Sequence, residues 1–566
     1  MFNTSASPSE PRYFMYTFPD YVEKVNVRIT SDSDVCAKIY ARKANCPAFD
    51  ASGLVELSDS SYYQSFTTFG GFSLRKSDIG PKFHLAFTVE PDDVVCETYT
   101  NLTENPYRVK NVNISVIPIF DETVQPIVPV VLYISVSFAV IVMTYFQCKW
   151  LNRNENNEPN SQQEIDSENS LVVDKIILFD KPANIVSYNK YHKNKLINES
   201  KYFNFLLFQF ITTIILSVPV LQQLKSIFPN ENTLTKNVNL DNCYLNYLCS
   251  SSVFGFNCFN GMISSNSMVV VGVVNLFIVF RKKIFKYKSP KPTTAHGVQK
   301  QDAAKVVTLL GMFAMGLFWT LISNCPHKSS LHFYTYTHSW TFISAFMWLH
   351  AKRHGTHVWQ HFFIIALSSV YGCLSFLEYA YEMTSNYVAF LFKNILFVFV
   401  CVSSTVFIAF NYVYESKKVF AVGLILLSVG WSVFSFYPDD ISVTKCIFCL
   451  EQCQVGFYLV YYVVQKIRFE RSTFNRKFVL TLVLIILTSI PVIIFYLIII
   501  NYESPWYLLW TPAKSRTLNR ECITPGIDWA DMDYYMTSAI FILFIIFMDF
   551  IDSNVKHIPK KHIFVF

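Results

Sequence analysis

Charged residues are scarce in this chain of 566 residues. Asp, Glu, Lys and Arg supply 16% of the sequence, whereas hydrophobic residues supply 52% and aromatic residues 17%. So little charge argues against an ordinary water-soluble protein and favours a membrane protein. The formal net charge of +6 is small, and its basic residues gather at the ends of apolar runs. We therefore interpret this charge as a signal of membrane topology rather than of nucleic-acid binding.

Long apolar runs occupy most of the chain from about residue 126 onward. A helix needs roughly 20 mainly apolar residues to cross the hydrocarbon core of a bilayer, and a helix satisfies its own backbone there. The sequence therefore predicts an α-helical polytopic membrane protein. Eleven spans are expected, near residues 126–148, 203–222, 263–280, 305–323, 334–350, 358–376, 388–411, 419–437, 444–465, 477–500 and 533–552.

The loops between these runs carry a consistent charge pattern. Lys and Arg accumulate on the cytoplasmic side of a membrane. Clusters such as Arg281-Lys282-Lys283, Lys352-Arg353 and Lys560-Lys561 fall on one side if the N-terminus is outside and the C-terminus is cytoplasmic. An odd number of spans requires the same result. The prediction is an integral protein of the plasma membrane or of an endolysosomal membrane.

Residues 1–125 have a different character, with alternating strand-like runs at Val25–Ile29, Phe83–Val89 and Val112–Ile117. Turn signals rich in Gly and Pro separate these runs, which predicts an extracellular antiparallel β-sandwich. Asn101-Leu-Thr and Asn113-Ile-Ser match the N-glycosylation pattern and would lie outside.

The expected domain order follows from these two parts. The β-sandwich covers residues 1–125, and the first transmembrane helix covers 126–148. A polar, partly disordered cytoplasmic linker covers 149–202. A ten-helix bundle with a short cytoplasmic tail covers 203–566.

Three cysteines lie in the predicted sandwich, namely Cys36, Cys46 and Cys96. Outside the cell one disulfide and one remaining thiol are expected, and we predict the pair Cys36–Cys46. An outside domain also needs a signal peptide, but Met1–Pro11 lacks the apolar core of one. We therefore expect a chain that lacks its natural start.

Several ordered segments resemble the systemic RNA interference defective (SID) transmembrane family. The segment Asp241–Cys249 resembles the extracellular Cys-Tyr-x-Asn-Phe-Leu-Cys signature of that family. Cys325-Pro326 resembles the start of the family's fifth-helix region, and Thr511–Arg516 with Cys522 resembles the loop before its last helix. Members usually carry two β-domains outside, whereas this chain has room for one. The chain is therefore similar to a divergent, N-terminally truncated paralogue.

The resemblance implies functions and partners. It implies uptake of double-stranded RNA across a membrane, with sterol (cholesterol) binding or uptake as the alternative. The implied partners are double-stranded RNA, membrane lipid including cholesterol, and a further copy of the chain. Cys243 and Cys249 become disulfide candidates because they stand in the resembling signature. Leu459, Tyr462 and Lys466 also match a weak pattern proposed for cholesterol contact.

The wider CREST group, which includes ceramidases, holds zinc in the membrane with three His and one Asp near a Ser. The positions of those ligands correspond here to Ser323, Tyr334, Asp531 and Tyr535, and no His occurs between Cys522 and Lys556. We therefore expect no family-type zinc, no cofactor and no enzyme activity. A zinc-dependent membrane lipid hydrolase is the least favoured function. A rebuilt metal site using His327, His332 or His338 stays open.

Two further sets of residues are candidates. Glu451 lies inside the ninth predicted span, where an acid is costly and needs a function or a partner, and Lys393 is a possible partner. Residues 1–125 hold 11 basic against 16 acidic residues, a balance of −5, which does not favour RNA in bulk. Local basic residues could still bind an RNA backbone, and these are Lys38, Arg42, Lys43, Arg75 and Lys76. The alternative is a solvated sheet face.

Overall fold

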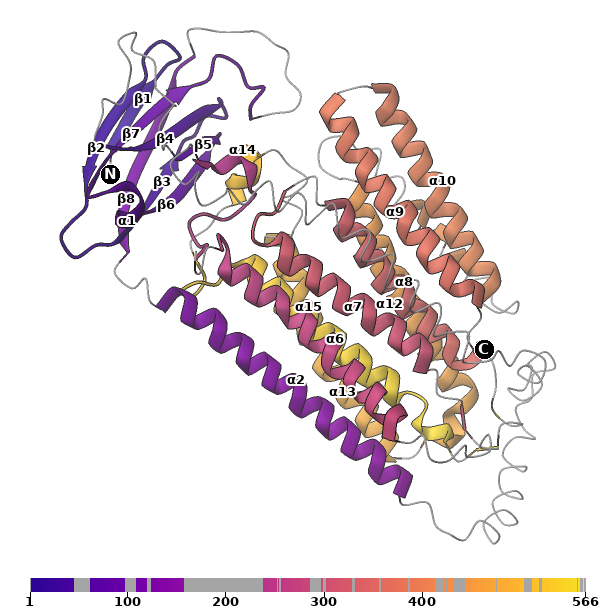
Figure 1. Ribbon diagram of the computed structural model, residues 1–566. Helices are drawn as coiled ribbons and strands as arrows, with labels where there is room; N and C mark the ends of the chain where they lie inside the picture. The colour runs from indigo at the N-terminus through magenta and orange to yellow at the C-terminus, as the bar shows by residue number, and fades with distance from the viewer. Residues whose placement is uncertain are drawn as a thin grey trace.

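Strands fill the chain up to Ile119 in the computed structural model, and long helices follow from Val124 (Figure 1). This change falls next to the predicted boundary at residue 125. The structure describes residues 2–44, 62–96, 108–119, 124–156, 238–285, 297–327, 331–355, 358–384, 387–412, 443–502, 512–518 and 522–563, with short gaps in several of these ranges, and short helical pieces between 422 and 430.

The strands form two sheets that pack face to face. The first sheet has the order β1-β8-β3-β6 and the second has the order β2-β7-β4-β5-β9. Their bounds are β1 Phe2–Ala6, β2 Arg12–Thr17, β3 Lys24–Thr30, β4 Ala37–Lys43, β5 Tyr62–Phe66, β6 Phe69–Arg75, β7 Lys82–Val89, β8 Lys110–Ile119 and β9 Val238–Asn239, with the short helix α1 at Lys76–Ile79. Alternate side chains such as Val27 and Ile39 face inward and are fully buried.

The predicted sandwich therefore forms, with one difference. Neighbouring strands are antiparallel except β9, which pairs parallel to β5 through Tyr62↔Val238 and Tyr63↔Asn239. β9 lies far along the chain from the other strands, in the segment before the next described helix. The sheet is thus completed by residues outside the predicted range 1–125.

Long helices coincide with most of the predicted spans. They are α2 Val124–Asn156, α6 Phe259–Phe285, α7 Asp302–Ile322, α8 Leu331–His354, α9 Val358–Thr384, α10 Tyr387–Tyr412, α12 Val443–Glu470, α13 Arg476–Tyr502 and α15 Trp529–Phe550. The helix α2 continues past residue 148, where the linker was expected to begin. The predicted span 203–222 and most of 419–437 lie outside the described residues, so the total of eleven stays a prediction.

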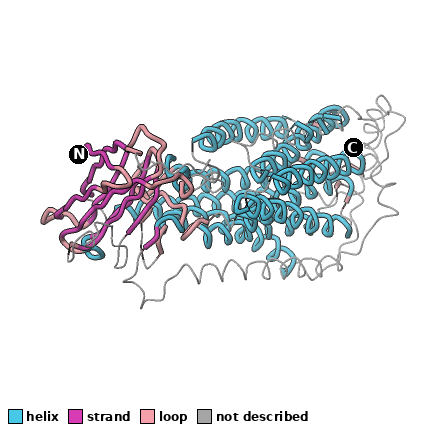
Figure 2. The backbone as a smooth tube through the Cα atoms, turned by 90° about the horizontal axis from the view of Figure 1, so that it is seen from above, coloured by secondary structure: helices cyan, strands magenta, loops and turns pink. Residues whose placement is uncertain are grey.

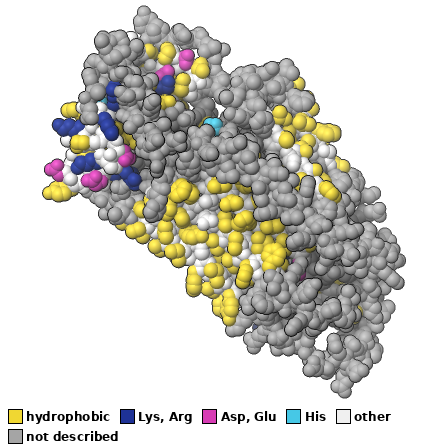
Figure 3. Space-filling view, in the orientation of Figure 1, with side chains coloured by type: hydrophobic (Ala, Val, Ile, Leu, Met, Phe, Trp, Pro, Cys, Tyr) yellow, Lys and Arg dark blue, Asp and Glu magenta, His cyan; other side chains and the backbone are white. Residues whose placement is uncertain are grey.

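Among the described residues, five helical segments are long and apolar enough to cross a membrane. They are Val124–Phe146, Phe259–Phe280, Asp302–Ile322, Cys446–Glu470 and Trp529–Val555. The helices run side by side away from the sheets, as both ribbon views show (Figures 1 and 2). Hydrophobic side chains cover the face along which α2 runs (Figure 3), and they include Ile127, Ile134 and Phe138 on α2. Such a face is suited to lipid contact.

Small residues allow three of these helices to pack closely. A Cβ atom at Gly316 of α7 would lie 2.7 Å from the backbone nitrogen of Val269 on α6. A Cβ at Gly311 of α7 would lie 3.1 Å from the Cα of Thr341 on α8. The close approach of backbones at glycine is a common device of membrane helices. It fixes the order α6–α7–α8 in the bundle.

Candidate functional site

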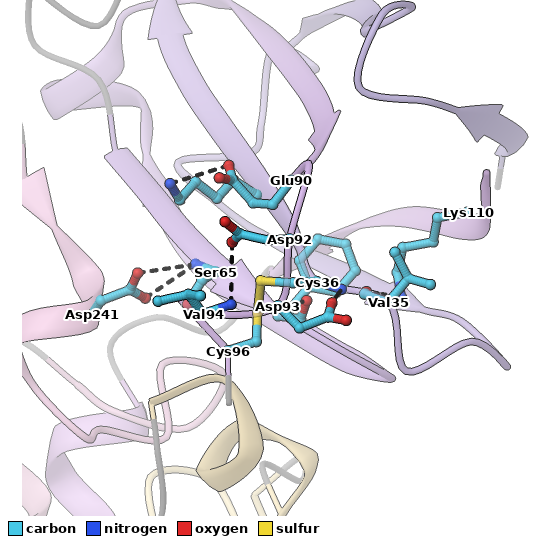
Figure 4. Close-up of a disulfide and its surroundings, with 12 residues drawn as sticks. Val35, Cys36, Ser65, Glu90, Asp92, Asp93, Val94, Cys96, Lys110 and Asp241 are labelled. Carbon is cyan, nitrogen blue, oxygen red and sulfur yellow. Dashed lines mark hydrogen bonds and ion pairs between the residues drawn. A yellow bond between two sulfur atoms is a disulfide. The ribbon is translucent and has the colours of Figure 1, made fainter. Parts of the chain in front are cut away.

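The segment before α6 attaches the sheets to the helices. The Asp241 carboxylate accepts hydrogen bonds from the backbone N–H of Ser65 in β5, at 3.0 and 3.3 Å (Figure 4). The same carboxylate lies 2.6 Å from the Arg516 guanidinium, which comes from the loop before α15. Arg516 also donates to the backbone carbonyls of Ser65 and Leu240. One arginine therefore joins the second sheet to two loops of the helical part.

Two disulfides brace the same junction. Cys243 is bonded to Cys325, which follows α7, and Cys249 is bonded to Cys522, which precedes α15. Cys243 and Cys249, the candidates taken from the signature, therefore both form disulfides, and each bonds to a distant loop. These bonds hold the loops before α6, after α7 and before α15 together at the end of the helices nearest the sheets.

The predicted pair Cys36–Cys46 is wrong in one partner. Cys36 is bonded to Cys96 with a Cα–Cα distance of 5.6 Å (Figure 4), and Cys46 lies outside the described residues. The reason is strand pairing. Cys36 directly precedes β4, which pairs antiparallel with β7, and Cys96 follows the end of β7. Pairing of Ala37 with Val89 therefore brings the residue before β4 next to the segment that follows β7.

The predicted RNA-contact residues lie on different parts of the sandwich. Lys38 and Arg42 occupy alternate positions with Tyr40 along β4 and therefore share one face of the second sheet, on which Lys38 is half-buried and Arg42 is buried. Lys38 forms an ion pair with Glu90 at 3.1 Å. Lys43 is exposed at the end of the strand. Arg75 and Lys76 lie at the end of β6 in the first sheet and the start of α1. The five predicted residues therefore form two groups on different sheets, one on β4 and one at the end of β6 and the start of α1.

Tyrosine and histidine side chains accompany the basic residues of β4. Tyr40 lies between Lys38 and Arg42, and its ring centroid is 6.0 Å from that of Tyr63 on β5. His84 on β7 is the cross-strand partner of Arg42. The outer face of the second sheet therefore combines cations with rings.

Lys110 carries a charge into the sandwich interior. Its side chain is fully buried, and Nζ donates to the backbone carbonyls of Ser33 and Val35 (Figure 4). Nζ also lies 5.5 Å from the centre of the Phe66 ring. Burial lowers the pKa of Lys110 to about 8, because the charged form loses its hydration.

The family zinc positions hold a hydrogen-bonded polar cluster. Asp531 accepts from Ser264 Oγ and from Asn260 Nδ2, each at 2.8 Å. It also accepts from the backbone N–H of Asp528 in the capping box that begins α15. Burial raises the pKa of Asp528. Ser323 lies across Gly261 from this cluster and donates to the carbonyl of Trp319.

The remaining zinc positions are occupied by packed tyrosines. The ring of Tyr334 lies 4.4 Å from that of Trp319, and the Tyr535 hydroxyl donates to the carbonyl of Pro129 on α2. Among the residues that the structure describes, no three His, Cys, Asp or Glu side chains form a group that could hold a metal ion. That this chain lacks family-type zinc stays a prediction.

Glu451 has a partner that differs from the expected one. Its Oε2 lies 3.0 Å from Nδ1 of His338 on α8. The Lys393 side chain lies outside the described residues, so the pair Glu451–Lys393 stays a prediction. Of the glycosylation candidates, Asn101 is not described, and Asn113 is half-buried in β8 between β1 and β3. Their modification also stays a prediction.

Comparison with known proteins decides the family. The sequence model described as "dsRNA-gated channel SID-1" matches residues 9–420 and 411–566. The chain belongs to the SID-1 family. It is 21% identical over 677 residues to human SID1 transmembrane family member 1, covering 100% of this chain and 79% of the relative. It is 22% identical over 638 residues to cholesterol uptake protein 1 of Caenorhabditis elegans, covering 99% of this chain and 81% of the relative.

Sequence reasoning missed a charged cluster at the opposite end of the SID-1 helices. Arg353 of α8 lies 2.7 Å from Glu470 of α12 and 2.7 Å from Asp552, which follows α15. Lys466 contacts the same two acids, and Tyr462 donates to Asp552. The sequence pattern that could have predicted this cluster is the i,i+4 spacing of Lys466 and Glu470, together with acidic residues at the ends of the spans. The cluster ties three helices together.

Proposed function

We propose that this SID-1 family protein binds double-stranded RNA with its β-sheets outside the membrane and mediates the transfer of RNA across it. The observation that carries the proposal is the family match over nearly the whole chain. It is supported by a junction at which Asp241 and Arg516 bond to the second sheet and disulfides brace the loops of the helical part. A rigid junction allows an event at the sheets to be transmitted to α6, α7 and α15.

The outer face of the second sheet is the proposed RNA contact. Double-stranded RNA is recognised through the shape and phosphates of its A-form backbone, and phosphate contact requires cations. Lys38 and Arg42 supply cations, and Tyr40 adds a hydroxyl to the same face. The loop before α6 packs on the first sheet, where Asn26 and Ser73 bond to backbone carbonyls of that loop. That loop covers part of the first sheet, so we assign the contact to the second sheet, where Lys38 is half-buried and Arg42 is 7% exposed.

The proposed orientation places the N-terminus outside and the C-terminus in the cytoplasm of cells, in the plasma membrane or an endolysosomal membrane. The disulfides support this orientation. Cys36–Cys96, Cys243–Cys325 and Cys249–Cys522 lie in the sheets or at the end of the helices nearest them. Disulfides form in oxidising compartments, so this end is expected to face the outside or a lumen.

An uptake assay tests the transport proposal. Cells that express the chain behind a secretory signal peptide should take up labelled double-stranded RNA several-fold more than untransfected cells. Uptake equal to that of untransfected cells, with the protein on the surface, would overturn the proposal.

Paired variants test the contact face. Lys38→Gln with Arg42→Gln should weaken RNA binding several-fold and reduce its dependence on salt concentration, because fewer phosphate contacts release fewer counterions. Arg75→Gln with Lys76→Gln removes the same charge from the first sheet and is the matched control. Equal loss in both double variants would contradict the assignment to the second sheet.

Sterol binding by the helices is the second candidate, favoured by the relationship to a cholesterol uptake protein. Tyr462 and Lys466 do not support it, since both side chains are buried and bound within the charged cluster. Photo-crosslinking of the purified protein with a sterol probe is the test. If an excess of free cholesterol prevents labelling of the protein by the probe, this function is supported. If labelling is unchanged by free cholesterol, specific sterol binding is excluded.

A zinc-dependent hydrolase is the least supported function, and a homo-oligomer stays a prediction from the sequence. We expect the purified protein to contain far less than one zinc ion per chain, because Asp531 is the single zinc-ligand type among the four family positions. Near-stoichiometric zinc after purification without added metal would reverse this expectation.

A further inference from the structure

The helix α12 turns its polar side chains inward and its apolar side chains outward. Val460, Val464 and Ile467 are 56%, 50% and 46% exposed and lie on one face of the helix. The buried polar side chains lie on the opposite face and include Thr444, Glu451, Gln454, Gln465 and Lys466. Polar residues within membrane helices are costly, and they usually serve a pathway or a binding site in the bundle interior.

The Glu451–His338 pair is the ionisable centre of this inward face. Glu451 Oε2 and His338 Nδ1 are 3.0 Å apart, and the two side chains are 1% and 4% exposed. Both residues lie about two turns inside their helices from the end nearest the sheets. The His338 ring stacks on Phe342 and contacts Phe448, with centroid distances of 4.3 Å for both. The pair is therefore enclosed by apolar rings.

One carboxylate oxygen of the pair is left without a hydrogen bond. Within the described part of the chain, Glu451 Oε1 is buried and has no hydrogen-bond partner, although Ser339 lies close enough to interact with the carboxyl group. A buried carboxylate with an unpaired oxygen is costly in free energy, because water no longer solvates its charge. A neutral carboxylic acid removes most of this cost.

We propose that Glu451 and His338 form a proton-binding site that holds one exchangeable proton inside the helical bundle. The proton comes from water, bonds to a Glu451 carboxyl oxygen, and is shared with the lone pair of His338 Nδ1. No covalent bond other than O–H forms or breaks, and the proton returns to water. With this proton the pair is neutral. Without it the pair carries a buried negative charge, and with a second proton it carries a buried positive charge.

A proton fits this site better than a metal ion. The carboxyl oxygen and the imidazole nitrogen are already at hydrogen-bond distance, so no ion lies between them. Aromatic rings rather than oxygen ligands surround the pair. No group of metal-binding side chains occurs among the residues described, which agrees with this choice of ligand.

Other titratable groups close to the pair come from each neighbouring helix. Tyr334 of α8 and Cys401 of α10 interact with Glu451, Asp533 of α15 interacts with Tyr334, and Tyr371 of α9 and Cys446 of α12 interact with Cys401. Asp533 is the acid among them, and its buried Oδ1 has no hydrogen-bond partner in the described residues. Lys393 of α10 is the cation to test, because its side chain is not described. This inference does not depend on the RNA proposal.

Infrared spectroscopy of the full chain in lipid bilayers tests the site. At pH 7 the wild-type spectrum minus that of Glu451→Gln should contain the carbonyl band of a protonated carboxylic acid. The band should shift after transfer to D₂O, because the proton exchanges. Asp533→Asn is the matched control and should retain the Glu451 band. A difference spectrum with carboxylate bands instead, or a band that does not shift in D₂O, would overturn the proposal.

Two further variants keep the test decisive if Glu451→Gln fails to fold. His338→Gln removes the base that shares the proton, so the acid band should be lost at lower pH than in the wild type. Lys393→Met should leave the band unchanged. If Lys393 were the true partner of Glu451, the wild type would show a carboxylate and Lys393→Met would convert it to an acid. That result would exclude the proton site.

Discussion

Lys110 both links two segments of the β-sandwich and makes the stability of the fold depend on pH. Its ammonium group is held by the carbonyls of Ser33 and Val35 and by the Phe66 ring, and these contacts join the end of β8 to the loop before β4. The desolvation of the charge outweighs these contacts, so the pKa falls to about 8. An unfolded lysine has a pKa near 10.4.

The first prediction follows from this difference in pKa. Between pH 8 and about 10 the unfolded state binds more protons than the folded state at Lys110, so the stability contribution of this residue rises with pH. The Tm of the purified protein minus that of Lys110→Met should therefore increase from pH 7.5 to 9.5. Differential scanning fluorimetry measures it. Lys82→Met, which changes an exposed lysine on β7, is the control and should give a constant difference. A constant difference for Lys110→Met as well would contradict the prediction.

For a single residue, the sequence can show that a contact is needed, but it does not show which residue supplies that contact. The intramembrane location of Glu451 predicted a need for a partner, but its partner His338 lies on a helix more than a hundred residues earlier. The same limit explains the error at Cys36. The sequence alone did not identify the partner of Cys36, whereas the pairing of β4 with β7 places it next to Cys96. Contacts set by tertiary structure leave no local pattern.

At the scale of elements, the apolar runs predicted the helices because length and hydropathy are local properties. The runs at 263–280 and 305–323 correspond to α6 and α7. Local properties could not predict which helices touch. Close packing of α6 on α7 depends on Gly316 lying opposite Val269 and Met268. The parallel strand β9 was missed for a related reason, since two residues form no periodic pattern.

The second prediction concerns Gly316. A methyl group there would lie 2.7 Å from the Val269 backbone nitrogen and 2.8 Å from Met268 Cβ, so the two helices must separate. Gly316→Ala should destabilise the protein by about 1–3 kcal/mol, the usual cost of overpacking. The measurement is the Tm in detergent. Gly456→Ala on α12 is the matched control, because no atom lies within 4 Å of the added methyl group. It should be neutral or stabilising by up to about 1 kcal/mol. Equal Tm values for both variants would show that the α6–α7 contact is loose.

At the scale of the whole molecule, two separate sets of contacts hold the SID-1 architecture together. At one end, Asp241 and Arg516 bond to Ser65 of the second sheet, and disulfides hold together the loops that carry these two residues and the loop after α7. The buried cluster around Arg353 joins α8, α12 and the end of α15 at the other end. The helix α15 takes part in both sets, since Cys522 precedes it and Asp552 follows it. A movement of the sheets can therefore reach the far end of the bundle through one helix.

The third prediction tests this connection at Arg516. Its side chain is 3% exposed, and replacing it by Gln leaves the Asp241 carboxylate without its cation. Loss of one partner of such a buried pair commonly costs about 3–5 kcal/mol. Arg516→Gln should therefore lower the Tm and reduce uptake of double-stranded RNA several-fold at equal surface expression. Adding Asp241→Asn removes the negative charge that faced Arg516 and should restore part of the Tm, while uptake stays low because Arg516 no longer joins the second sheet to the helical part. Arg108→Gln, at an ion pair within the β-sheets, is the control and should leave uptake unchanged. Full uptake in Arg516→Gln would show that transport does not require this contact between sheets and helices.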